Sequence, residues 1–111
     1  MARPMKNRIE FTYKLSILLK QMADEGERVI LDYVKRSQEE QRRLFEKGLS
    51  KCDGINIPSR HQSGMAADIY FETEDYKMLE DPQLGWEFWH EEWEELGGKP
   101  IIMWDKNHFE G

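Results

Sequence analysis

The sequence predicts a small α+β fold in which a mostly antiparallel sheet is flanked by helices. Two stretches have the apolar spacing of amphipathic helices, and three short runs are rich in β-branched, aromatic or other apolar residues. Helices and strands do not alternate strictly and the central connections are short, which disfavours a doubly wound parallel sheet. At 111 residues the chain has a common domain size, so we expect residues 1–111 to form a single domain with one core.

The first predicted element is an amphipathic helix over about residues 8–24. Asn7 followed three positions later by Glu10 is typical of a helix start, and Gly26 is well placed to end the helix. Five apolar side chains recur at helical spacing: Phe11, Leu15, Leu18, Leu19 and Met22.

The next two predicted elements are a strand and a second helix. Residues 28–35 alternate and are rich in Val, Ile, Leu and Tyr, a pattern typical of a strand. Ser37 and Glu40 have the spacing of a capping box, and Gly48 can terminate the helix that follows.

A loop and a strand are expected in the middle of the chain. Residues 50–63 are rich in Gly, Pro, Asn, Asp and Ser, so His61 is expected in a loop. Residues 66–71 then form a predicted strand that carries Asp68.

The C-terminal part is predicted to hold a tryptophan-bearing helix and a last strand. Four side chains share one helical face, and we expect them to be core packing rather than a ligand platform: Trp86, Trp89, Trp93 and Leu96. Gly97 and Gly98 should stop this helix, and residues 100–104 are predicted to form a short apolar strand that His108 follows closely.

Composition excludes several classes of protein. The chain has 16 basic and 22 acidic residues and a formal net charge of −6, which argues against nucleic-acid binding. No apolar run approaches the length of a membrane span, and the N-terminus does not resemble a secretory signal. We therefore expect cytoplasmic synthesis without a signal peptide, no membrane insertion, and, by default, a monomer. Cys52 is the only cysteine, so no internal disulfide is expected.

Two imidazoles and a carboxylate form a candidate zinc site. His61 and Asp68 are separated by a loop in which Gly64 permits a tight turn, so both can reach one ion, and His108 can supply the third ligand. A catalytic zinc has three protein ligands of this type and an open position for water. Asp105, three residues before His108, would then remain as a base.

Two other interpretations of these polar residues were considered. The sequence alone leaves open that the three candidate ligands are unrelated polar residues on separate surfaces. His90 and the following acidic residues begin like the helical zinc motif of other metallopeptidases, but Glu94 stands where the second histidine is required. We therefore predict that His90 and its acidic neighbours form a solvated helix face.

Two motifs and a third, shorter block resemble a known family. Residues 59–68 read Ser-x-His-x-x-Gly-x-Ala-x-Asp, residues 105–110 read Asp-x-x-His-Phe-Glu, and residues 36–44 read Arg-Ser-x-x-Glu-Gln-x-x-Leu. They resemble the zinc peptidases of bacterial cell-wall peptides, which include D-alanyl-D-alanine carboxypeptidases and the L-alanyl-D-glutamate endopeptidases found among phage endolysins. The resemblance extends from about residue 28 to the C-terminus.

The resemblance implies a fold and a set of roles. The fold would be the small α+β fold that these peptidases share with the Hedgehog signalling domain. The zinc ligands would be His61, Asp68 and His108, and Asp105 would be the catalytic base. Two further residues would face the substrate: Arg36, which would hold a carboxylate or the developing oxyanion, and Ser59, which would contact the bound peptide.

The expected function is therefore zinc-dependent hydrolysis of amide bonds in peptidoglycan stem peptides, with an endolysin-type L-alanyl-D-glutamate endopeptidase as the first expectation. A carboxypeptidase of the D-Ala-D-Ala type is the alternative within the family. From another class, a non-catalytic zinc-containing module would only bind cell-wall peptides, with Cys52 as the residue that could close the zinc site. An enzyme made without a leader would reach the cell wall through a separate pore or after lysis, as phage or prophage products do.

Two departures from the family stand out. The connection at residues 97–99 is short, whereas many relatives carry an aromatic-rich loop there. With a single expected domain, we also expect no attached cell-wall-binding module.

Overall fold

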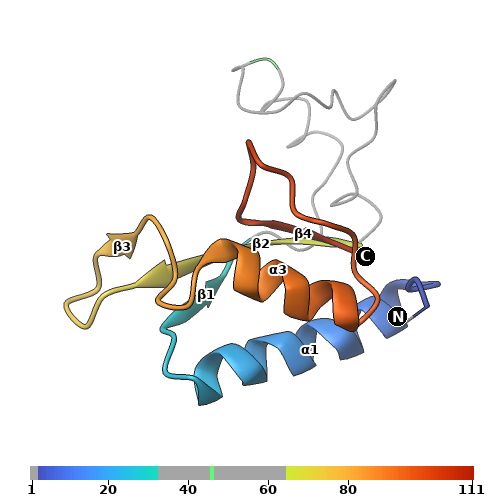
Figure 1. The fold of residues 1–111 in the computed structure, drawn as a ribbon, viewed down its shortest axis with the longest axis horizontal. Coiled ribbons are helices and arrows are strands. Elements are labelled where there is room, and N and C mark those ends of the chain that lie inside the picture. Colours follow the sequence, from blue (N-terminus) through green and yellow to red (C-terminus); the bar gives the residue numbers. More distant parts are fainter. Residues whose placement is uncertain (1–2, 33–45, 47–64) are drawn as a thin grey trace.

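The computed structural model describes residues 3–32, 46 and 65–111 (Figure 1). Its elements are α1 (Arg8–Asp24), β1 (Val29–Leu31), β2 (Ala66–Glu72), β3 (Met78–Leu79), α3 (Trp86–Glu95) and β4 (His108–Glu110). The predicted helix that begins near Ser37, the predicted loop around His61, and Cys52 lie outside the described residues.

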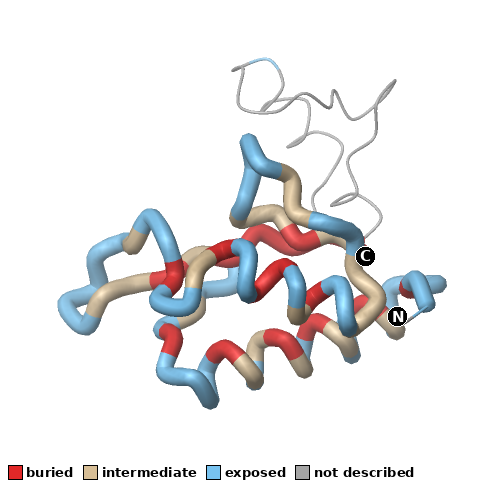
Figure 2. Tube along the Cα trace, in the orientation of Figure 1, coloured by how far each residue is buried: buried red, intermediate tan, exposed pale blue. Residues whose placement is uncertain are grey.

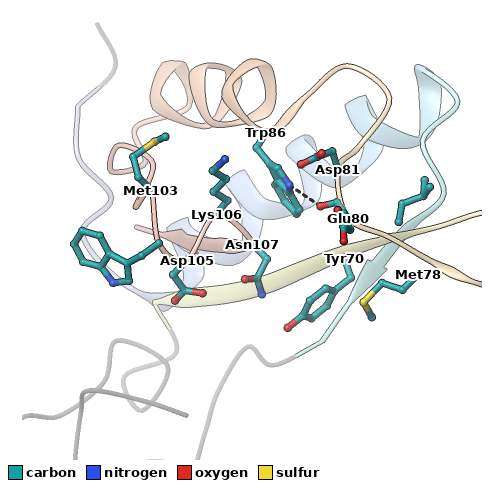
Figure 3. Close-up of a pocket in the computed structure, with 11 residues that line it drawn as sticks. Tyr70, Met78, Glu80, Asp81, Trp86, Met103, Asp105, Lys106 and Asn107 are labelled. Atoms are coloured by element: carbon teal, nitrogen blue, oxygen red, sulfur yellow. Dashed lines mark hydrogen bonds between the residues drawn. The ribbon is translucent and has the colours of Figure 1, made fainter. Parts of the chain in front are cut away.

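The fold is α+β, as predicted, and its four-stranded sheet is antiparallel throughout. Strand β2 lies at the centre, since it pairs with β1, β3 and β4. Side chains alternate along a strand, so Ala67, Ile69 and Phe71 enter the core while Asp68 and Tyr70 belong to the opposite face. Figure 3 shows Tyr70 on the side of β2 away from the helices. The two described helices, α1 and α3, therefore pack on the face of β2 opposite to Asp68 and Tyr70.

Helix α1 forms where its apolar spacing and its cap predict it. The backbone N–H of Glu10 donates to Oδ1 of Asn7 at 2.9 Å, which satisfies one of the unpaired donors of the first turn. Gly26 has a φ of +85° just beyond the helix, a conformation that favours glycine. Leu19 packs against the core, and the other four predicted apolar residues are buried in it: Phe11, Leu15, Leu18 and Met22. Figure 2 shows buried positions recurring along α1.

Helix α3 buries its tryptophans in the core, as predicted. The Trp93 ring makes edge-to-face contacts with Phe11, at a centroid distance of 5.7 Å, and with Phe109, at 6.2 Å. Its indole N–H donates to the backbone carbonyl of Glu110 at 2.9 Å. These contacts join both helices to β4 and so fix the strand on which His108 lies.

A buried carboxylate holds the segment that precedes α3. Glu27 is only 5% exposed. Its carboxylate accepts hydrogen bonds from the backbone N–H groups of Gln83 and Leu84, at 2.8 and 3.3 Å, and from the indole N–H of Trp89 at 2.6 Å. A buried carboxylate with several donors is a structural anchor, and this one ties the end of α1 to the start of α3.

The predicted strand at residues 100–104 is wrong. These residues form no strand, and the last strand is β4, which begins at His108 itself. Pro100 has no N–H to donate to a ladder, and Met103 and Trp104 are 56% and 77% exposed. Asp105 therefore lies in the turn before the strand, and His108 lies within it.

The prediction that His90 is solvated is also wrong. His90 is 1% exposed and its ring stacks on Phe109, with a centroid distance of 3.9 Å and an interplanar angle of 7°. The aromatic stack withdraws His90 from water, while the acidic neighbour Glu91 stays exposed.

The predicted strand at residues 28–35 is found only as Val29–Leu31 within the described part of the chain. Neither described helix is long and apolar enough to cross a membrane.

Candidate metal centre

Two of the three predicted ligands face each other across the β2–β4 pair. The antiparallel register places Asp68 directly opposite His108, and the neighbouring Ile69 N–H donates to the carbonyl of Asn107 at 2.9 Å. Nδ1 of His108 lies 3.5 Å from Oδ1 of Asp68, and these side chains are 10% and 12% exposed. The two residues are 40 positions apart in the chain, and strand pairing brings their side chains together.

The turn before β4 positions Asp105. Its N–H donates to the carbonyl of Ile102 at 2.9 Å, and the N–H of His108 donates to the carbonyl of Asp105 at 3.0 Å. The second of these bonds closes a tight turn in which Asp105 immediately precedes the strand. Asp105 lines the same pocket as Tyr70 and Asn107, and the charge of its carboxylate contributes to raising the pKa values of both His108 and Tyr70.

Carboxylates on both sides of the ring raise the pKa of His108 above its usual value. Burial alone would lower this pKa, but hydrogen bonds with Asp68 and Glu110 and the negative charges of Asp68 and Asp105 outweigh burial. The two ring nitrogens have different partners, because Nδ1 faces Asp68 and Nε2 lies 3.2 Å from Oε1 of Glu110. Such an arrangement fixes the orientation of the imidazole.

Glu110 is a site residue to which sequence reasoning gave no role. Burial raises the pKa of its carboxyl, but hydrogen bonds with His108 and Lys99 and the charge of Lys99 lower it overall. A carboxylate is one of the common partners of the second ring nitrogen of a metal-bound imidazole. The signal in the sequence was the two-residue spacing within a strand, which puts the side chains of residues 108 and 110 on one face.

His90 supports the same segment from the core side. Its Nε2 lies 2.6 Å from the carbonyl oxygen of Lys106 and donates a hydrogen bond to it. Burial lowers the pKa of His90, with a smaller contribution from the charge of His108, although the bond to the carbonyl opposes the shift. His90 is therefore a neutral ring that holds the backbone two residues before His108.

Tyr70 places a hydroxyl on the same face of β2 as Asp68. Burial raises its pKa, and the negative charges of Asp68, Asp32 and Asp105 raise it further, while a hydrogen bond with Asn107 opposes the shift. The phenol therefore stays protonated at neutral pH and remains a hydrogen-bond donor in the pocket that Asp105 and Asn107 also line. Sequence reasoning missed this residue, and its two-residue spacing from Asp68 was the available signal.

The other predicted site residues, His61, Arg36 and Ser59, lie outside the described residues. Within the described part of the chain, no group of three or more His, Cys, Asp or Glu side chains is arranged to hold a metal. Asp68 and His108 supply two of the three expected ligands there.

The donors that are described suit zinc. One carboxylate oxygen and one imidazole nitrogen meet at a site shielded by the sheet, and nitrogen and oxygen donors of this kind bind zinc in catalytic sites. Strands β2 and β4 carry these two candidate ligands, and Asp105 lies in the turn before β4. Comparisons of the whole sequence with protein-family models and with curated proteins found no match.

Proposed function

We propose that this chain is a zinc peptidase that hydrolyses amide bonds in peptidoglycan stem peptides, as an L-alanyl-D-glutamate endopeptidase of the endolysin type. The observation that carries the proposal is the pairing of Asp68 and His108 across β2 and β4, with Asp105 in the turn beside them. Groups with perturbed pKa values cluster at functional sites, and the pKa values of His108 and Tyr70 are both raised on this face of the sheet.

Asp68 and His108 would hold the zinc together with His61, and Arg36 and Ser59 would contact the peptide. A zinc ion held there would supply a Lewis acid, whose chemistry is to lower the pKa of bound water towards neutrality. Glu110 keeps the His108 ring in place through its contact with Nε2.

Asp105 acts as the general base in this proposal. Its carboxylate accepts a proton from water as the water oxygen bonds to the amide carbon, which gives a tetrahedral intermediate with a negative oxygen. It then passes that proton to the amide nitrogen, so that the C–N bond breaks and the amine leaves as the carbonyl re-forms. The protonated Tyr70 hydroxyl, on the same face of β2, can donate a hydrogen bond to the bound peptide. The guanidinium of Arg36 would stabilise the negative carbonyl oxygen.

Digestion of purified peptidoglycan tests the proposal. Zinc-loaded protein should release peptides that mass spectrometry identifies as cut between L-alanine and D-glutamate. Release of terminal D-alanine alone would identify the protein as a carboxypeptidase instead. Sedimentation of intact protein with the cell walls, without any change in muropeptide masses, would identify a binding module and contradict the proposal.

A further inference from the structure

A pocket of about 490 Å³ opens beside Asp105. Its volume is within the range of small-ligand sites. Its lining includes Tyr70 and Asn107 from the face of the metal centre, and it extends past Trp86 to the segment that follows β3 (Figure 3). A peptide whose scissile bond lies next to Asp105 would therefore place a neighbouring residue in this pocket.

One wall of the pocket is apolar and is formed by Trp86 and Met78. The indole N–H of Trp86 donates to the backbone carbonyl of Glu80 at 2.9 Å, and the ring packs on Phe71 at a centroid distance of 5.3 Å. Met78 lines the same pocket and is 67% exposed. Methionine is a flexible apolar side chain, so covering it with another apolar group would lower the free energy. A ligand with an aliphatic chain would cover this apolar surface.

The charges in the pocket are separated. Figure 3 shows Asp105 and Lys106 on one side of Trp86, and Glu80 and Asp81 on its other side. Among the described residues, neither Glu80, nor Asp81, nor Lys106 has an ion-pair partner within 4.0 Å. The acidic end lies beyond the apolar wall as viewed from Asp105, so the pocket is complementary to an aliphatic chain that ends in a cation.

We propose that this pocket binds the side chain of a diamino acid in the substrate peptide, such as lysine or diaminopimelate. The aliphatic chain lies on Trp86 and Met78, and the terminal ammonium group lies at Glu80 and Asp81. Lys106, at the end near the base, suits a carboxylate on the residue between the scissile bond and the diamino acid. This inference rests on the proposed function, because the distance from Asp105 defines which residue of the peptide enters the pocket.

Three matched peptides test the proposal with the zinc-loaded full chain. Each has the form L-Ala-γ-D-Glu-X-D-Ala, where X is lysine, Nε-acetyllysine or norleucine, so the ammonium group is kept, neutralised or deleted. Both kcat/KM for cleavage and the dissociation constant from calorimetry are measured. We expect the lysine peptide to be favoured by about tenfold, because hydrogen bonds to charged groups are among the stronger ones.

A double variant with a matched control assigns the preference to the pocket. In Glu80→Gln/Asp81→Asn the ratio between the lysine and norleucine peptides should fall to near one. Glu94→Gln/Glu95→Gln removes the same charge from exposed residues at the far end of α3 and should keep the ratio. A ratio that stays the same in both variants would overturn the proposal.

The two measurements separate failure of this inference from failure of the proposed function. Cleavage and binding that are equal for all three peptides would overturn the diamino-acid pocket and leave the peptidase standing. Binding that favours lysine without any cleavage would support the pocket and contradict the peptidase. Neither binding nor cleavage of any peptide would overturn both.

Discussion

Asp105 separates the proposed enzyme from a protein that only binds zinc. The hydrogen bonds with Ile102 and His108 fix its backbone in the turn before β4, next to the strand pair on which Asp68 and His108 meet. A general base must lie next to the metal-bound water. Zinc binding by His61, Asp68 and His108, in contrast, does not require Asp105. The role of Asp105 can therefore be tested without removing the metal.

The variant Asp105→Asn should keep its zinc and lose turnover. Asparagine has nearly the same shape but accepts no proton, and a positioned base contributes about 10²–10⁴ in rate. Release of muropeptides and zinc content are measured on the same preparation. Full activity in Asp105→Asn would show that another group takes the proton.

His90 makes the metal-free protein less stable in acid. Its folded-state pKa lies below 6.5, the usual histidine value, because of burial. Above pH 6.5 His90 is largely neutral in both the folded and the unfolded protein. As the pH falls below 6.5, the unfolded chain binds a proton that the folded protein excludes, so the free energy of unfolding decreases.

The variant His90→Gln removes this proton uptake and keeps a donor for the Lys106 carbonyl. Urea unfolding of chelator-treated protein from about pH 7.5 to about pH 5.5 should show a smaller loss of stability in acid than wild type shows. His108 affects stability in the opposite direction, because its raised pKa stabilises the folded state below pH 6.5. This contribution is the same in the wild type and in His90→Gln, so it does not affect the comparison. An unchanged acid dependence would contradict the assignment to His90.

The elements differ in how far their sequences determine them. Helix α1 has a side-chain cap and a regular apolar face, both of which are local, and its observed bounds Arg8–Asp24 match the prediction. The tryptophan spacing likewise predicts α3. The short apolar run at residues 100–104 gave a wrong strand, because the strand that forms is the one that pairs with β2, and pairing depends on distant residues.

The candidate site was predictable in part for the same reason. Residue types and spacing singled out Asp68, His108 and Asp105, and the structure brings the first two together. Burial of His90 depends on its stack with Phe109, and the role of Glu27 depends on donors near the start of α3. The local sequence shows only that positions 27 and 90 carry polar side chains, so it could not predict that either side chain is buried.

The segment between β3 and α3 depends on Glu27. In Glu27→Gln an amide NH2 group replaces one carboxylate oxygen. This group must face a backbone or indole N–H that donates to the carboxylate in the wild type. We expect a loss of about 2–3 kcal/mol in the free energy of unfolding, because a buried donor loses a charged partner. Glu25→Gln, at the exposed neighbouring carboxylate, is the control in urea unfolding and should change stability little. Equal stability of the two variants would remove Glu27 as an anchor.

For the molecule as a whole, metal binding and folding should be coupled. The proposed ligands come from separate segments of the chain, and the strand pair that aligns Asp68 with His108 exists only in the folded state. Free energy of zinc binding therefore adds to the free energy of unfolding. The zinc-loaded protein should melt at a higher temperature than the chelated protein, as scanning calorimetry can measure.

The most direct test is the zinc affinity of chelator-treated protein, measured by calorimetric titration. The wild type should bind one zinc ion per chain. Asp68→Asn and His108→Gln should lose tight binding, while Glu74→Gln, a change at an exposed carboxylate in the turn after β2, should keep it. Equal zinc affinity in all four proteins, or no zinc binding by the wild type, would contradict a metal centre on the β2–β4 pair.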